Sequence, residues 1–304
     1  MNVWRLQLKP SPEMGINHQD VLDFCEKNGI IGVGWNQITC RTDSYDDLRE
    51  AIQTSCYDKD KKRGALRAIN AMRQMQPGDL IWTRQGGFGS DYYLCRVGKT
   101  LWKDRVITPE HIRYDISNYV SAEWARIGTE DVVPGKVVAS FRARGSAQRI
   151  YEVEDISKYI WNQHCKNESE KYQENTLDQS QFWNLIGSED LECLVLLYLQ
   201  RKGYLLYSST VKRDTKEFEA VMVASDGSHR AFPQVKQNTK LDPKDYTGKL
   251  EPNDLTYLFS SSEEYGMPHP QAVCISRQEI EDFIKADYNI LPQTIKNWLA
   301  MIVR

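Results

Sequence analysis

Four polar side chains in the C-terminal part of the chain combine the types that hold a metal ion and stabilise negative charge: Glu192, Glu219, Gln234 and Lys236. Magnesium prefers oxygen ligands, so a carboxylate and an amide oxygen can hold it while several waters stay bound. A neighbouring lysine stabilises charge on a phosphate or orients water. We expect Glu219 and Gln234 to hold Mg²⁺ or Mn²⁺, Lys236 to stabilise charge, and Glu192 to act as a second acid or water-mediated ligand.

The spacing of these residues depends on a helix and several strands. An apolar helix over 188–203 carries Glu192, and strand-like runs follow at 204–210, 217–225 and 230–237. Gln234 and Lys236 alternate along the last run, so both point to one side while Val235 faces the core. A Gln-x-Lys triplet also arises by chance, and Glu192 alone could be a solvated acid near a helix start. Further runs at 256–262, 272–286 and 292–304 predict a central mixed sheet flanked by helices.

This segment resembles the PD-(D/E)XK nuclease superfamily, in particular its Mrr-type restriction nucleases. The matching residues are Glu192-Cys-Leu-Val, Gly203-Tyr204, Glu219 and Gln234-Val235-Lys236, across about residues 185–240. The resemblance implies metal-dependent phosphodiester hydrolysis at Glu192, Glu219, Gln234 and Lys236. The family more often has Asp in the second strand, so Asp214 competes with Glu219 for that position.

The N-terminal part mixes short strands and helices in a different pattern. We expect strands in 3–8, 29–35, 79–84 and 91–102, a late strand or hairpin in 135–153, and helices in 18–29, 44–56 and 64–75. The charged run 58–63 is expected to be a surface loop. Strands closed by Gly turns, with helices between them, predict a small decorated barrel.

Aromatic and basic residues alternate near the turns of this part. We expect a nucleic-acid pocket from Trp35, Trp82, Arg84, Tyr92, Arg142 and Arg144, because aromatic faces stack on bases and arginines hold phosphates. Each tryptophan could instead pack in a core. The motif PGDLIWTR…YYLCRV resembles the PUA-like barrels, including the EVE and ASCH groups, over about residues 1–155. That resemblance implies a domain that accepts a base or modified base.

Length and composition set the frame for these motifs. The 304 residues carry a net charge of −3 and are 40% hydrophobic, which excludes wholesale disorder and a histone-like polycation. We expect a reader domain at 1–160, a linker at 161–182 and a nuclease domain at 183–304. The sequence has seven cysteines and no CxxC pair, and it shows neither an apolar run of membrane length nor a secretion signal. These features predict a cytoplasmic protein with free thiols.

The two resemblances together suggest an endonuclease that recognises DNA, modified DNA in particular, and restricts foreign DNA. Cutting both strands needs two active sites, so a homodimer is expected. Two alternatives stay open. The N-terminal part could bind a small nucleotide signal that activates the nuclease, or the chain could be a non-catalytic nucleic-acid-binding protein.

Overall fold

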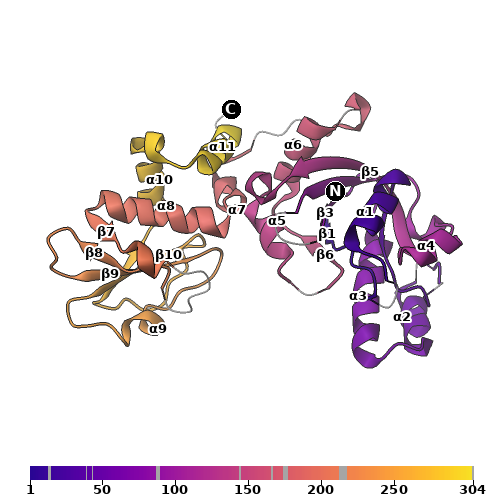
Figure 1. Cartoon of the computed structure of the whole chain (residues 1–304), viewed down its shortest axis with the longest axis horizontal. Coiled ribbons are helices and arrows are strands. Elements are labelled where there is room, and N and C mark those ends of the chain that lie inside the picture. The colour runs from indigo at the N-terminus through magenta and orange to yellow at the C-terminus, as the bar shows by residue number, and fades with distance from the viewer. Residues whose placement is uncertain are drawn as a thin grey trace. The chain divides into compact units, whose positions relative to one another are not determined.

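The computed structural model describes residues 1–12, 15–38, 40–42, 44–86, 90–143, 145–165, 167–173, 177–211 and 218–302. The chain divides into two compact units, Met1–Leu177 and Asp178–Arg304. Each unit has its own mixed β-sheet with helices packed against it, so the protein is of the α+β class (Figure 1). The segment 161–182, expected to be a linker, contains the end of one helix and the point of division.

The first unit is built on a six-stranded sheet of order β2-β5-β4-β3-β1-β6. β1 and β3 run parallel, and every other neighbouring pair is antiparallel. β2 and β6 are the two edges, so the described strand pairing stops short of a closed barrel. The strands are β1 (Val3–Leu6), β2 (Ile30–Val33), β3 (Leu80–Arg84), β4 (Tyr92–Val97), β5 (Asn118–Gly128) and β6 (Ala147–Ile150). The helices are α1 (His18–Lys27), α2 (Tyr45–Thr54), α3 (Lys59–Gln74), α4 (Pro109–Arg113), α5 (Gly135–Ser140) and α6 (Glu154–His164).

Apolar side chains cover both faces of this sheet. On one face Leu6 and Ile81 pack in a core with Val21 of α1 and Ile69 of α3. On the other face Trp82 is buried and bonds to α6. Because both faces of the sheet are covered, the strand LIWTR is buried at four successive positions instead of alternating between buried and exposed.

Two expectations about local structure in the first unit are wrong. The run 58–63 is helical rather than a loop, because the carboxylate of Asp58 caps α3 by accepting from the backbone N–H groups of Asp60 and Lys61. In the segment 135–153, residues Gly135–Ser140 form α5 and only Ala147–Ile150 form a strand. Pro134, with φ of −52°, precedes α5 and is already set for a helix start.

The second unit is built on a five-stranded sheet of order β11-β10-β9-β8-β7. β9, β10 and β11 are parallel, whereas β7, β8 and β9 are antiparallel, so the sheet is mixed as the sequence predicted. The strands are β7 (Tyr204–Leu206), β8 (Met222–Ala224), β9 (Arg230–Lys236), β10 (Leu255–Ser260) and β11 (Ala272–Ile275). The helices are α7 (Phe182–Leu185), α8 (Ser188–Arg201), α9 (Lys244–Thr247), α10 (Arg277–Ala286) and α11 (Gln293–Ile302).

Helices lie on both sides of the second sheet. α8 runs along one side and α9 lies on the other (Figure 1). Trp183 of α7 packs against Phe259 of β10, with ring centroids 5.5 Å apart. Phe259 pairs with Val235 in the parallel ladder, so Val235 shares that helix-covered face and Gln234 and Lys236 point to the other. None of the helices in the described ranges is long and apolar enough to span a lipid bilayer.

Candidate active site

β9 is the central strand of the second sheet and carries two of the four expected site residues. Its first residue, Arg230, forms an ion pair with Asp254 just before β10, and the Arg230 Nε lies 3.1 Å from the Asp254 Oδ2. The ladder with β10 then fixes the register, pairing Gln234 with Leu258 and Lys236 with Ser260. Gln234 is fully buried, whereas the Lys236 side chain is 39% exposed.

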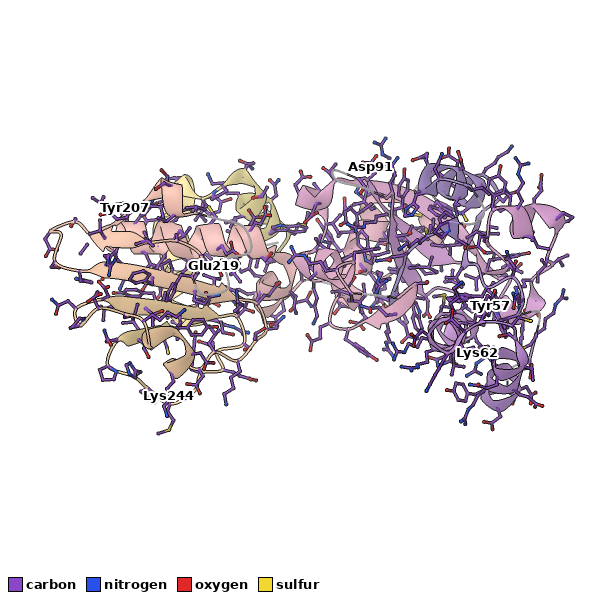
Figure 2. All side chains as sticks on the ribbon, turned by 60° about the horizontal axis from the view of Figure 1, so that its bottom comes forward. Tyr57, Lys62, Asp91, Tyr207, Glu219 and Lys244 are labelled. Atoms are coloured by element: carbon purple, nitrogen blue, oxygen red, sulfur yellow. The ribbon has the colours of Figure 1, made fainter. Side chains whose placement is uncertain are left out.

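Glu219 reaches this strand from the segment just before β8. Its backbone N–H donates to the carbonyl of Pro233 over 2.9 Å, which extends the pairing of β8 with β9 by one further contact. Proline has no N–H to donate, and it is tolerated here because the regular β8–β9 pairing ends at Ala231. The Glu219 side chain is 10% exposed (Figure 2 labels it on the second unit).

The three side chains meet at one carboxylate oxygen. Oε1 of Glu219 accepts from Nε2 of Gln234 over 3.0 Å and from Nζ of Lys236 over 3.2 Å. The half-exposed ammonium limits the stability that this ion pair contributes. Its geometric effect is clearer: it holds a cation beside a nearly buried carboxylate while part of that cation stays open to solvent.

Gln234 has an oxygen acceptor that the protein leaves unused. Its Oε1 is buried and has no hydrogen-bond partner among the residues that the structure describes. Leaving a buried acceptor unsatisfied costs about 1–3 kcal/mol, so such an atom calls for an explanation. A bound divalent cation would explain it, because an amide oxygen beside a carboxylate suits Mg²⁺ or Mn²⁺. Within the described ranges no three His, Cys, Asp or Glu side chains gather as a metal site, so protein ligation here would be limited to one carboxylate and one amide.

α9 places a further side chain near this carboxylate, and no sequence pattern singled it out. Burial raises the pKa of Tyr246, and the carboxylates of Asp245 and Glu219 raise it further. Tyr246 therefore lies within electrostatic range of Glu219 while remaining half-buried.

Two further expectations concern acids outside this contact. Glu192 is half-buried on α8 and takes no part in the hydrogen bonds that join Glu219, Gln234 and Lys236, so its catalytic role stays a prediction. Asp214, the competitor of Glu219, lies outside the described residues. Glu219 is the acid that the described structure joins to the Gln-x-Lys strand.

In the first unit, three of the expected nucleic-acid contacts lie close together. The Nη1 of Arg84 donates to the hydroxyl of Tyr92 over 3.3 Å, and its guanidinium lies over the Tyr92 ring. Tyr92 is buried, and burial raises its pKa, whereas the nearby cations of Arg84 and Arg142 lower it. Arg142 is exposed and Arg84 half-buried, so the group is partly open to solvent. Arg144 lies outside the described residues.

Trp35 lies at a different place, after β2. It is half-buried, its ring meets Tyr57 edge-on with centroids 5.3 Å apart, and its indole edge passes close to Gly64 of α3. Its φ of +67° is uncommon for a residue with a side chain. Strained backbone of this kind often accompanies binding sites, which keeps Trp35 as a candidate.

Trp82 needs a correction as a base-stacking residue. Its side chain is fully buried, and its indole N–H donates to Oγ of Ser157 in α6 over 3.0 Å. Both faces of the ring are therefore covered by the core, and no face is left for a base. The alternating pattern could not show this, because it does not reveal that α6 covers that side of β3.

Comparisons with known proteins return no relative. No protein family, curated protein or solved structure matches this chain significantly. Any function must therefore be argued from the residues themselves.

Proposed function

We propose that this chain is a metal-dependent endonuclease whose second unit hydrolyses phosphodiester bonds. The observation that carries the proposal is the junction of Glu219, Gln234 and Lys236 around one carboxylate oxygen, with a buried amide oxygen left without a partner. It is also the order and arrangement that the resemblance to PD-(D/E)XK nucleases implies.

The residues divide the chemistry among them. Glu219 and Gln234 would hold Mg²⁺ or Mn²⁺ through a carboxylate and an amide oxygen. A divalent cation supplies positive charge at the phosphate and lowers the pKa of water. The ammonium of Lys236, 39% exposed, is positioned to donate to a phosphate oxygen as its negative charge grows. The full burial of Gln234 keeps its polar atoms fixed beside the Glu219 carboxylate.

We further propose that the first unit selects the DNA. The strained, half-buried Trp35 offers an aromatic ring, and the exposed Arg142 offers a phosphate contact. Cleavage controlled by a base or a modified base fits restriction of foreign DNA. Two chains acting together would cut both strands.

The deciding experiment measures cleavage of modified and unmodified DNA with and without magnesium. Lys236→Ala and Glu219→Gln should each lower the rate by about 100-fold or more, the usual loss when a preorganised charge-stabilising group is removed. Lys285→Ala, at an exposed position of α10, is the matched control and should cut like the wild type. Equal cleavage by all four proteins, or none by the wild type under any condition, contradicts the proposal.

A further inference from the structure

Arg5 of β1 is an unusual residue for the centre of a sheet. It is fully buried, and its Nη1 donates to the carbonyl of Gly145. Its Nε and Nη2 are buried and have no hydrogen-bond partner within the described ranges. A guanidinium has five N–H donors, so an arginine in the interior normally has acceptors or a carboxylate around it.

Arg105, in the same unit, shows how a buried arginine is ordinarily satisfied. It too is fully buried, and its guanidinium donates to the carbonyls of Ser117, Trp102 and Cys40 and to the side chain of Asn118. The fold can therefore surround a buried guanidinium with acceptors. At Arg5 it supplies one acceptor and leaves two donor atoms free.

A second arginine lies beside Arg5. The guanidinium carbons of Arg5 and Arg84 lie 5.7 and 5.1 Å from the centroid of the same ring, that of Phe141. Desolvation by burial, and to a smaller extent the charge of Arg84, together lower the pKa of Arg5 to about 10. Neither arginine forms an ion pair with an acid in the described ranges.

The surrounding charges do not neutralise this pair. On the Tyr92 side, the exposed Glu130 raises the pKa of Tyr92, while the cations Arg84 and Arg142 lower it, so one acid stands against two arginines there. His18 has its pKa lowered by burial and by the cations Lys9 and Arg84, so that side of the group is also basic. Two positive charges therefore remain, one of them buried.

We propose that Arg5 and Arg84 form a binding site for a phosphomonoester in the first unit. The fork of N–H groups on each guanidinium matches phosphate oxygens, and Arg84 is half-buried, which gives the site an opening to solvent. A phosphomonoester carries a charge of about −1.5 to −2 near neutral pH, which balances two arginines, whereas a backbone diester carries only one charge. The hydroxyl of Tyr92, bonded to Arg84, adds a further polar group beside the anion.

This site is independent of the metal chemistry in the second unit, so it can exist whether or not the chain cuts DNA. The phosphomonoester could be carried by a free nucleotide or by the phosphorylated end of a nucleic acid strand. Both present the same anion to the arginines, and the experiment separates them.

The experiment measures binding to the full-length chain by titration calorimetry, with thermal melting alongside. The probes are a nucleoside monophosphate, a 5′-phosphorylated oligonucleotide and the same oligonucleotide without its phosphate. We expect saturable binding of at least one phosphomonoester, and the preferred probe identifies the source. Arg84→Gln and Arg5→Met should each weaken that binding by about tenfold or more, the effect of losing a hydrogen bond to a charged group.

Three controls make the outcome decisive. Without a ligand, Arg5→Met should melt no lower than the wild type, because it removes a buried charge that has no counter-ion. Should Arg5→Met fail to fold, Arg84→Gln decides alone. Arg149→Gln, an exposed position on β6, should bind like the wild type. Absence of phosphomonoester binding, binding unchanged in Arg84→Gln, or equal binding of the unphosphorylated oligonucleotide overturns the proposal.

Discussion

Gln234→Met is the substitution that best separates a functional role of the buried amide from a structural one. Methionine keeps the unbranched shape of glutamine and removes its polar atoms. If the amide serves to hold a cation, its removal should abolish cleavage and barely change stability. If the amide serves the fold, its removal should destabilise the second unit.

The expected change in stability follows from two opposing terms. Losing the 3.0 Å bond from Nε2 to the Glu219 carboxylate removes about 1.5–3 kcal/mol. Removing the buried, unpartnered Oε1 returns about 1–3 kcal/mol, because that acceptor is desolvated without compensation in the folded state. At the middle of these ranges the two terms nearly cancel, so the free energy of unfolding should change by less than about 2 kcal/mol in either direction.

Gln237, just past the end of β9, is the matched control. Its Nε2 donates to the carbonyls of Trp183 and Ile186 over 2.9 and 3.0 Å, so Gln237→Met breaks two bonds and leaves two acceptors behind. It should lower the free energy of unfolding by about 1–3 kcal/mol. Urea denaturation gives the free energy of unfolding of both variants, and the two values are comparable if the m-values agree. A larger loss in Gln234→Met than in Gln237→Met would refute the reasoning.

The other predictions concern single residues of the two units. Trp82→Phe loses the hydrogen bond to Ser157 and some packed volume, so it should lower the free energy of unfolding by about 1–3 kcal/mol in urea denaturation. It should leave DNA affinity unchanged in an anisotropy assay, whereas Trp35→Ala should weaken DNA binding in the same assay. Burial raises the pKa of Tyr265 to about 12, so the folded state keeps this proton after the unfolded chain loses it. Stability should then fall from pH 10 to about 12, and Tyr265→Phe should flatten that fall in pH-dependent melting. Arg230→Met leaves the carboxylate of Asp254, 5% exposed, without its counter-ion. Because the Arg230 side chain is 47% exposed, solvent screens this pair, and the loss should be about 1 kcal/mol by chemical denaturation. No loss relative to the wild type contradicts the role of this pair in anchoring β9.

The part of the site that the sequence predicts well rests on strand periodicity. Gln234 and Lys236 are two residues apart on one strand, so their common face follows from the alternation alone. The arrival of Glu219 depends on a single backbone bond to Pro233, and no local pattern encodes that contact. Glu219 was selected only because the resemblance expects an acid in the second strand, before the Gln-x-Lys strand. Asp214 also fitted that expectation, so the sequence left the two acids as alternatives.

The errors in the first unit share a cause. Sequence patterns report which residues avoid water, but not which partner covers them. The sequence predicts an accessible aromatic at Trp82, because the pattern does not reveal that α6 covers this residue. It predicts a strand over Gly135–Ser140, because valines favour strands when their surroundings are unknown. Arg5 is the reverse case: the alternation of VWRLQL places it with Gln7 opposite the apolar Trp4 and Leu6, so the sequence did not predict its full burial.

Binding of Mn²⁺ to the full-length protein tests the central claim most directly, because it depends on neither a substrate nor turnover. Titration calorimetry or electron paramagnetic resonance should show saturable Mn²⁺ binding to the wild type, at least tenfold weaker in Glu219→Gln and weakened in Gln234→Met, with about tenfold corresponding to one lost charge-assisted contact. Mn²⁺ binding of equal affinity in the wild type and Glu219→Gln would contradict the assignment of this carboxylate as the ligand.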